Sequence, residues 1–169
     1  MNFGEFLKLA HILFVIVGFS GAVGFHVIMP MAARSTDLSF VRAALKFGFI
    51  FENLAFPGFI IAGLLGLWLS IYQDWDFGEN TWLNISATIW IIAVLGALVI
   101  LRPGLRRLDR LAREAPGPDV PPELSAEFRR PLQFITPNLL TLAMLVVLYL
   151  MIAKPGVDFA GIDHWPVNT

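Results

Sequence analysis

Four long apolar segments occupy most of this 169-residue chain and restrict what it can fold into. They run over residues 6–29, 47–71, 82–101 and 132–153. An α-helix needs about 20 apolar residues to cross the roughly 30 Å of hydrocarbon in a bilayer. The backbone finds no water there, so each crossing segment must satisfy its own hydrogen bonds as a helix. The sequence therefore predicts an all-α, polytopic membrane protein in which four transmembrane helices form a single up-down bundle.

The composition indicates which partners and chemistries to expect. Charged residues make up 15% of the chain, whereas soluble domains carry about 25%. The net charge of −1 does not indicate a nucleic-acid partner. The chain has no cysteine, which excludes disulfides, thiolate metal sites and cysteine nucleophiles. The partner that the sequence predicts is the lipid bilayer.

The basic residues predict how the chain is oriented in the membrane. They gather in the first connection and in the linker 102–131: Arg34, Arg42, Lys46, Arg102, Arg106, Arg107, Arg110, Arg113, Arg129 and Arg130. The second connection is acidic, with Asp74, Asp76 and Glu79. Since basic connections remain on the cytoplasmic side, we expect a multi-pass protein of the bacterial cytoplasmic membrane. Both termini would then lie outside, together with the tail 154–169.

The linker 102–131 divides into two parts. Leu105, Leu108 and Leu111 repeat every three residues among arginines, which predicts a short helix. This helix would either lie on the inner membrane surface or extend the third segment. Residues 116–122 are rich in proline and favour a stiff spacer.

Histidines inside an apolar segment are costly and point to function. His11 and His26 both lie in the first segment, fifteen positions apart. At about 1.5 Å of rise per residue they are separated by roughly 22 Å along a helix, so one haem cannot use both. His11 is the candidate ligand of a haem b or a porphyrin, with Gly18 and Ala22 forming a shallow groove on its helix face. Met144 is a candidate second ligand to the iron.

The alternative for His11 is a packed, hydrogen-bonded position inside the bundle. Three further polar residues, Glu52, Asn53 and Asn138, predict a polar pocket towards the cytoplasmic half. Glu52 could instead pair with Lys46 or Arg42 near the membrane surface. An interhelical hydrogen bond between Asn53 and Asn138 would join the second and fourth segments.

The start of the chain resembles the first helix of several small bacterial membrane families. The residues that carry the resemblance are Phe6-Leu-Lys-Leu-Ala-His11-Ile-Leu and Gly18-Phe-Ser-Gly21. The families are an uncharacterised family of four-helix integral membrane proteins, the copper-resistance D-like proteins and the small membrane-type protoporphyrinogen oxidases. The first of them is the most similar in length and layout. The oxidase resemblance implies a haem or porphyrin at His11.

These observations favour a haem- or porphyrin-associated membrane redox protein that uses His11. The competing hypothesis is a cofactor-free structural or accessory subunit, in which the histidine and asparagines only hold helices together. A small transporter ranks third, because Glu52 and the two histidines alone could move charge. The small size and the Gly18/Ala22 groove favour a homodimer or a place in a larger membrane complex.

The orientation can be tested with reporter fusions. A reporter fused after Asp76 should give an external signal, and one fused after Pro118 a cytoplasmic signal, because only the second follows the arginine-rich linker. The two fusions control for each other. The opposite pattern would place His11 in the inner half of the membrane.

Overall fold

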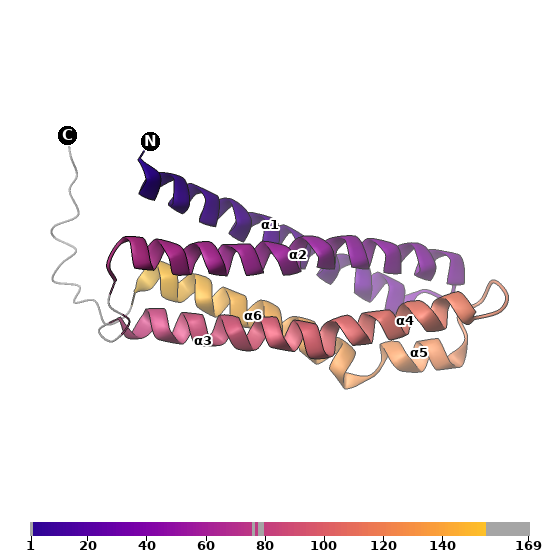
Figure 1. Ribbon diagram of the computed structural model, residues 1–169. Coiled ribbons are helices and arrows are strands. Elements are labelled where there is room, and N and C mark those ends of the chain that lie inside the picture. Colours follow the sequence, from indigo (N-terminus) through magenta and orange to yellow (C-terminus); the bar gives the residue numbers. More distant parts are fainter. Residues whose placement is uncertain (1, 76, 78–79, 155–169) are drawn as a thin grey trace.

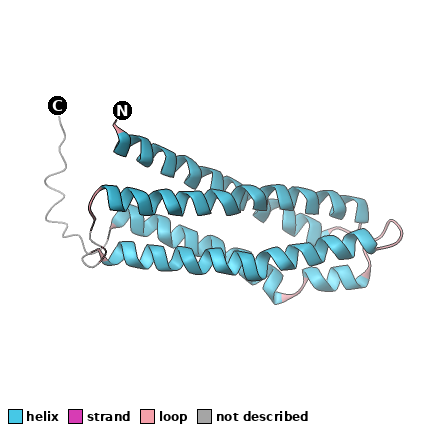
Figure 2. Cartoon of the chain, in the orientation of Figure 1, coloured by secondary structure: helices cyan, strands magenta, loops and turns pink. Residues whose placement is uncertain are grey.

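The computed structural model describes residues 2–75, 77 and 80–154, and the regular structure in this part of the chain is helical (Figures 1 and 2). The elements in chain order are α1 (Phe3–Arg34), α2 (Leu38–Tyr72), α3 (Thr81–Gly96), the π-helix η1 (Ala97–Leu101), α4 (Arg102–Glu114), α5 (Pro122–Phe128) and α6 (Pro131–Ala153). Four helical segments are long and apolar enough to cross a membrane. The all-α, four-span fold is therefore confirmed.

The helices continue well past the apolar segments at the end of the bundle that contains α4 and α5, here called the arginine-rich end. The α3, η1 and α4 elements form one continuous segment of 34 residues, Thr81–Glu114. At about 1.5 Å per residue it is roughly 50 Å long, well beyond the roughly 30 Å of hydrocarbon. Of the two arrangements expected for the helix at Leu105–Leu111, the structure has the one that extends the third segment.

A tight connection joins α1 to α2 at this end. The sequence placed a gap between residues 29 and 47, but α1 runs to Arg34 and α2 begins at Leu38. The side chain of Asp37 caps α2, because it accepts a hydrogen bond from the backbone N–H of Ser39 at 2.8 Å. Hydrogen bonds from the Ser39 hydroxyl and backbone hold the pKa of Asp37 below its ordinary value. Hydropathy marked the membrane crossing here but not the ends of the helices.

The arginine-rich end has a small hydrophobic core of its own. The starts of α2, α4 and α5 bury their leucines against each other: Leu38, Leu45, Leu105, Leu108 and Leu124. Arg42 closes the end of α4, because its guanidinium donates to the carbonyls of Ala112 and Ala115, both at 2.9 Å. The predicted linker is thus mostly a packed helical extension of the bundle.

A buried carboxylate fastens α5 to its neighbours. Glu127 is only 4% exposed and pairs with Arg107 of α4 and with Arg130, each at 3.0 Å. Gln133 at the start of α6 donates to the same carboxyl group. One acidic side chain therefore joins α4, α5 and α6.

Aromatic rings gather at the opposite end of the bundle. Trp75 and Trp82 pack edge to face with ring centroids 5.4 Å apart. The ammonium of Lys154, which follows α6, lies 4.7 Å from the Trp75 ring centroid. Burial, and then the charge of Lys8, lower the pKa of Lys154. Trp165, in the predicted external tail 154–169, lies outside the described residues.

Within the apolar region the helices associate as two pairs, α1 with α2 and α3 with α6 (Figure 1). Small residues bring α1 and α2 close together. A Cβ atom at Gly58 of α2 would lie 2.7 Å from the backbone nitrogen of Gly18 on α1. Small residues permit such approach in lipid. The groove at Gly18 is therefore filled by α2 of the same chain, not open to a second molecule.

This contact predicts a specific loss of stability. A Cβ at Gly18 would already lie 2.8 Å from the Phe59 ring, so Gly18→Leu should force α1 and α2 apart and cost about 1–3 kcal/mol. Val17 is 38% exposed and adjoins it, so Val17→Leu is the matched control. Thermal unfolding in detergent measures both variants. Equal midpoints for the two would contradict the close α1–α2 contact.

Candidate functional site

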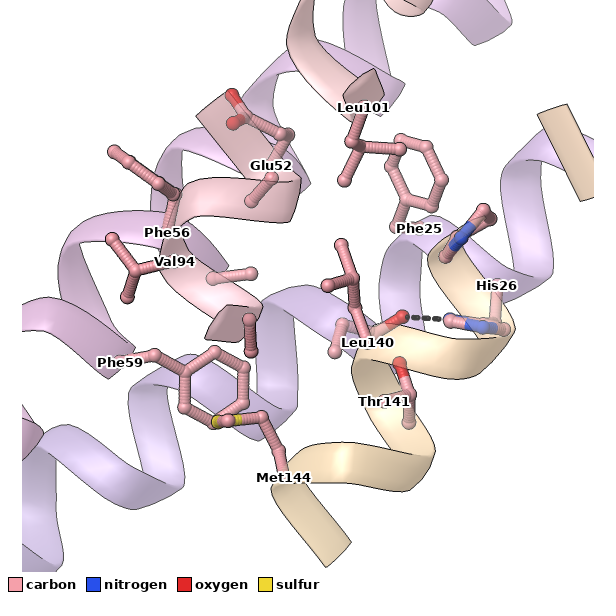
Figure 3. A pocket seen from close by; sticks show the side chains of 15 residues that line it. Phe25, His26, Glu52, Phe56, Phe59, Val94, Leu101, Leu140, Thr141 and Met144 are labelled. Carbon is pink, nitrogen blue, oxygen red and sulfur yellow. Dashed lines mark hydrogen bonds between the residues drawn. The ribbon is translucent and has the colours of Figure 1, made fainter. Parts of the chain in front are cut away.

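A partly open cavity of about 70 Å³ lies where the two helix pairs meet (Figure 3). Every membrane-crossing segment contributes to its wall: Ala22, Phe25, His26, Glu52, Ala55, Phe56, Phe59, Ala93, Val94, Ala97, Leu101, Pro137, Leu140, Thr141 and Met144. In Figure 3, Phe59 and Met144 lie together on one side of the cavity, and Glu52 lies on another. The lining is almost entirely apolar, so its few polar groups decide what the cavity can hold.

His26 is the polar group whose hydrogen bonding is incomplete. Its Nδ1 lies 2.8 Å from the carbonyl oxygen of Ala22, one turn earlier in α1. A carbonyl oxygen only accepts, so Nδ1 carries the hydrogen and Nε2 presents a lone pair when the ring is neutral. Nε2 is buried and has no hydrogen-bond partner among the described residues. Buried polar groups are nearly always paired, so this acceptor needs an explanation.

Glu52 is held by an arginine from another helix. Its carboxylate accepts from Arg102 Nε at 2.6 Å and from Nη2 at 3.3 Å. Arg102 also donates to Asn53 at 3.2 Å and lies 4.2 Å above the Phe56 ring. The expected partners Lys46 and Arg42 were therefore wrong. Arg42 is occupied at the end of α4, as described above.

The π-helix η1 forms the wall between the cavity and Arg102. Arg102 donates its backbone N–H to Ala97, five residues earlier. Pro103 follows directly, and a proline inside a helix removes a donor and clashes with the carbonyl four residues before it. The wider turn accommodates that proline and brings Arg102 to Glu52. Such π-turns are frequent at functional sites.

The structure separates His11 from this cavity. Its Nδ1 lies 2.8 Å from the carbonyl oxygen of Ala62 on α2, and its ring packs on Gly66, where a Cβ would come within 2.9 Å. Of its expected companions, Gly18 packs on α2, whereas Ala22 and Met144 line the cavity with His26. His11 and Met144 are not brought to one site.

A six-coordinate haem between His11 and Met144 therefore does not fit the residues present. The cavity that contains Met144 has about 70 Å³, whereas an engineered cavity that binds a single benzene ring has about 150 Å³. Within residues 2–75, 77 and 80–154, no group of three or more His, Cys, Asp or Glu side chains could hold a metal ion. His164, the other histidine, lies outside the described residues.

The predicted hydrogen bond between Asn53 and Asn138 was also wrong. Asn138 donates at 2.6 Å to Phe134 of its own helix, and Asn53 accepts from Arg102. A different hydrogen bond between the pairs is one that the sequence reasoning missed. Trp90 of α3 donates its indole N–H to the carbonyl of Phe59 at 2.9 Å and packs over Gly63.

Comparisons with known proteins agree with the architecture. Residues 5–155 match the sequence model of one family, described as predicted integral membrane protein (DUF2269). No curated protein and no solved structure matches significantly. The comparisons give no support to the resemblance to copper-resistance D-like proteins or protoporphyrinogen oxidases. The match confirms the expected membership of a small integral membrane family.

The ion pair beside the cavity predicts an asymmetric mutational effect. Arg102→Met would leave the carboxylate of Glu52, which is 4% exposed, buried without a partner, at a cost of about 3–5 kcal/mol. Glu52→Gln should cost less, because the Arg102 side chain is 26% exposed and can reach the surface.

Unfolding free energies in mixed micelles measure both changes. Arg106→Met, at an exposed position on the same helix, is the matched control and should have little effect. A cost for Arg102→Met no greater than for Arg106→Met would refute the buried pair.

Proposed function

Because the chain belongs to the DUF2269 family of predicted integral membrane proteins, we propose that its function lies within the bilayer. It binds a small lipid-phase molecule in the cavity between the two helix pairs and holds the polar group of that molecule on His26. One observation carries the proposal. Nε2 of His26 is buried beside the cavity and has no partner in the described part of the chain, and a buried polar atom without a hydrogen bond costs about 1–3 kcal/mol. A ligand with a matching polar group would remove that cost.

The packing around the cavity supports the same proposal. Close glycine contacts hold α1 on α2, and α3 lies along α6. Between the pairs, the cavity is lined by rings and small side chains, among them Phe56, Phe59 and Ala93. Ligand sites in helical bundles are commonly placed between helices and lined mostly by apolar groups.

The proposed location is the inner half of a bacterial cytoplasmic membrane. The arginines of α4, together with Arg129 and Arg130 after α5, support this placement through the positive-inside rule, and the cavity lies at the depth where α4 begins. A homodimer, or a larger complex, would have to use helix faces other than the Gly18 groove, which α2 occupies.

Filling the cavity tests the proposal. A photoreactive alkyl diazirine of ten carbons, added to the protein in nanodiscs, should label peptides that contain Phe59 or Met144. Ala93 is buried and lines the cavity, so Ala93→Phe should reduce this labelling by about tenfold, equivalent to about 1.4 kcal/mol of binding free energy.

The control for that experiment is Leu98→Phe, at a position on η1 that is 42% exposed. It adds a ring facing away from the buried region and should leave the labelling unchanged. Labelling spread evenly over the lipid-facing surface, unaffected by Ala93→Phe, would overturn the proposal.

A haem-associated redox function is the second candidate, and one observation favours it. The carbonyl of Ala62 fixes the His11 proton on Nδ1, which is how metal-ligating histidines are usually held, so that Nε2 is the ligating atom. In this candidate function His11 would be the single axial ligand. A b-type haem would supply one-electron redox chemistry there.

Absorption spectroscopy tests this second candidate. Protein purified from cells supplied with haem precursor should show a Soret band that His11→Ala abolishes. His26→Ala is the control and should leave the band intact, because His26 lies about 22 Å along the helix by its rise per residue. A colourless protein under these conditions would exclude the haem function.

A further inference from the structure

We infer that the cavity is selective for a neutral hydroxyl head group, as carried by a long-chain or isoprenoid alcohol. The inference rests on the proposed function and names the class of ligand that the site would take. Three properties of the cavity support the inference: the hydrogen-bonding role of His26, the neutralised charge of Glu52, and the volume of the cavity.

The histidine sets the direction of the hydrogen bond. Since Nδ1 already donates to Ala22, the free Nε2 of the neutral ring can only accept. A ketone, an aldehyde or an ether offers only acceptors and would leave Nε2 unpaired. The head group must therefore bring a donor hydrogen.

The charges beside the cavity exclude an ionic head group. The lining contains a single carboxylate, Glu52, and Arg102 already neutralises it with two hydrogen bonds. The Arg102 guanidinium also donates to Asn53 and lies over the Phe56 ring. Among the described lining residues, a carboxylate or phosphate head would find no free cation, and an ammonium head would find no free anion. Burying an unpaired charge is costly, so a neutral donor is favoured.

The volume selects a small head group. About 70 Å³ is roughly half the volume of an engineered cavity that binds benzene, about 150 Å³. That space holds a hydroxyl and its first carbons but not a ring system. The cavity is partly open (Figure 3), so the remaining chain can continue between the apolar side chains into lipid. An alcohol with a long apolar tail satisfies all three properties.

Nitrogen NMR of the histidine side chains tests the inference on the intact protein in nanodiscs. The chain has three histidines, so single substitutions assign each ¹⁵N resonance. Adding 1-decanol should shift the His26 Nε2 resonance towards the position of a hydrogen-bonded acceptor, while His11 stays unchanged. Decyl methyl ether, decanoate and decylamine match the tail and should each bind about tenfold more weakly.

The variant His26→Leu separates recognition from simple partitioning. Leucine fills the cavity wall with a side chain of comparable length but has no acceptor nitrogen. This variant should therefore bind the alcohol and the ether equally. Equal binding of decanol and its ether by the unmodified protein would overturn the hydroxyl inference while leaving the cavity proposal in place. A His26 Nε2 that is already hydrogen-bonded without ligand, and unmoved by decanol, would show a resident water and would also overturn it. Failure of the diazirine to label the cavity, in contrast, would overturn the proposed function itself.

Discussion

Helices in a bilayer gain nothing by exchanging lipid contacts for apolar contacts with each other, and this constraint shapes the whole structure. Association depends instead on close backbone packing and on buried polar contacts. The chain places these at a few positions. Gly18 and Gly58 allow α1 and α2 to touch, and His11 bonds across the same interface to Ala62. The Trp90 bond to Phe59 then ties α3 to α2.

The uneven distribution of these contacts explains the cavity. Each close approach holds two helices, so the bundle consists of two pairs rather than four equivalent neighbours. Where the pairs meet, Glu52 and Arg102 supply a strong polar contact on the arginine-rich side, and the packed leucines around Leu108 fix α4 beyond it. Between this contact and the Trp90 contact, apolar side chains leave space beside His26. The cavity is thus a consequence of how a bundle is held together in lipid.

The sequence was sufficient for the fold but not for the site, and particular residues show why. Hydropathy located the membrane crossings, because a run of about 20 consecutive apolar residues is typical of a transmembrane helix. It did not locate helix ends, since Leu38 and Leu108 lie in charged segments and are buried by packing between neighbouring helices. Glu52 was recognised as costly, but its partner lies 50 residues away and is placed by the π-turn before Pro103.

The two histidines show the same limit. Both were visible as polar groups in an apolar segment, and helix geometry correctly separated them. His11 was favoured for its small-residue neighbours, yet Gly18 receives α2 and Ala22 lines the cavity with His26. Only the arrangement of all four crossings shows that His26, and not His11, borders the cavity with a nitrogen that no described residue pairs. No local pattern in the first segment could have predicted that His26 borders a cavity, because the residues of the cavity wall come from all four segments.

The central claim is that an apolar cavity separates the two helix pairs beside His26. A crystal structure of the protein grown in a lipid phase and exposed to xenon under pressure tests it most directly, because xenon enters apolar cavities. We predict one xenon atom in contact with Phe59 and Met144, with His26 Nε2 unbonded to any other helix. A closed interface without xenon, in which Nε2 accepts a hydrogen bond from a neighbouring helix, would contradict the claim.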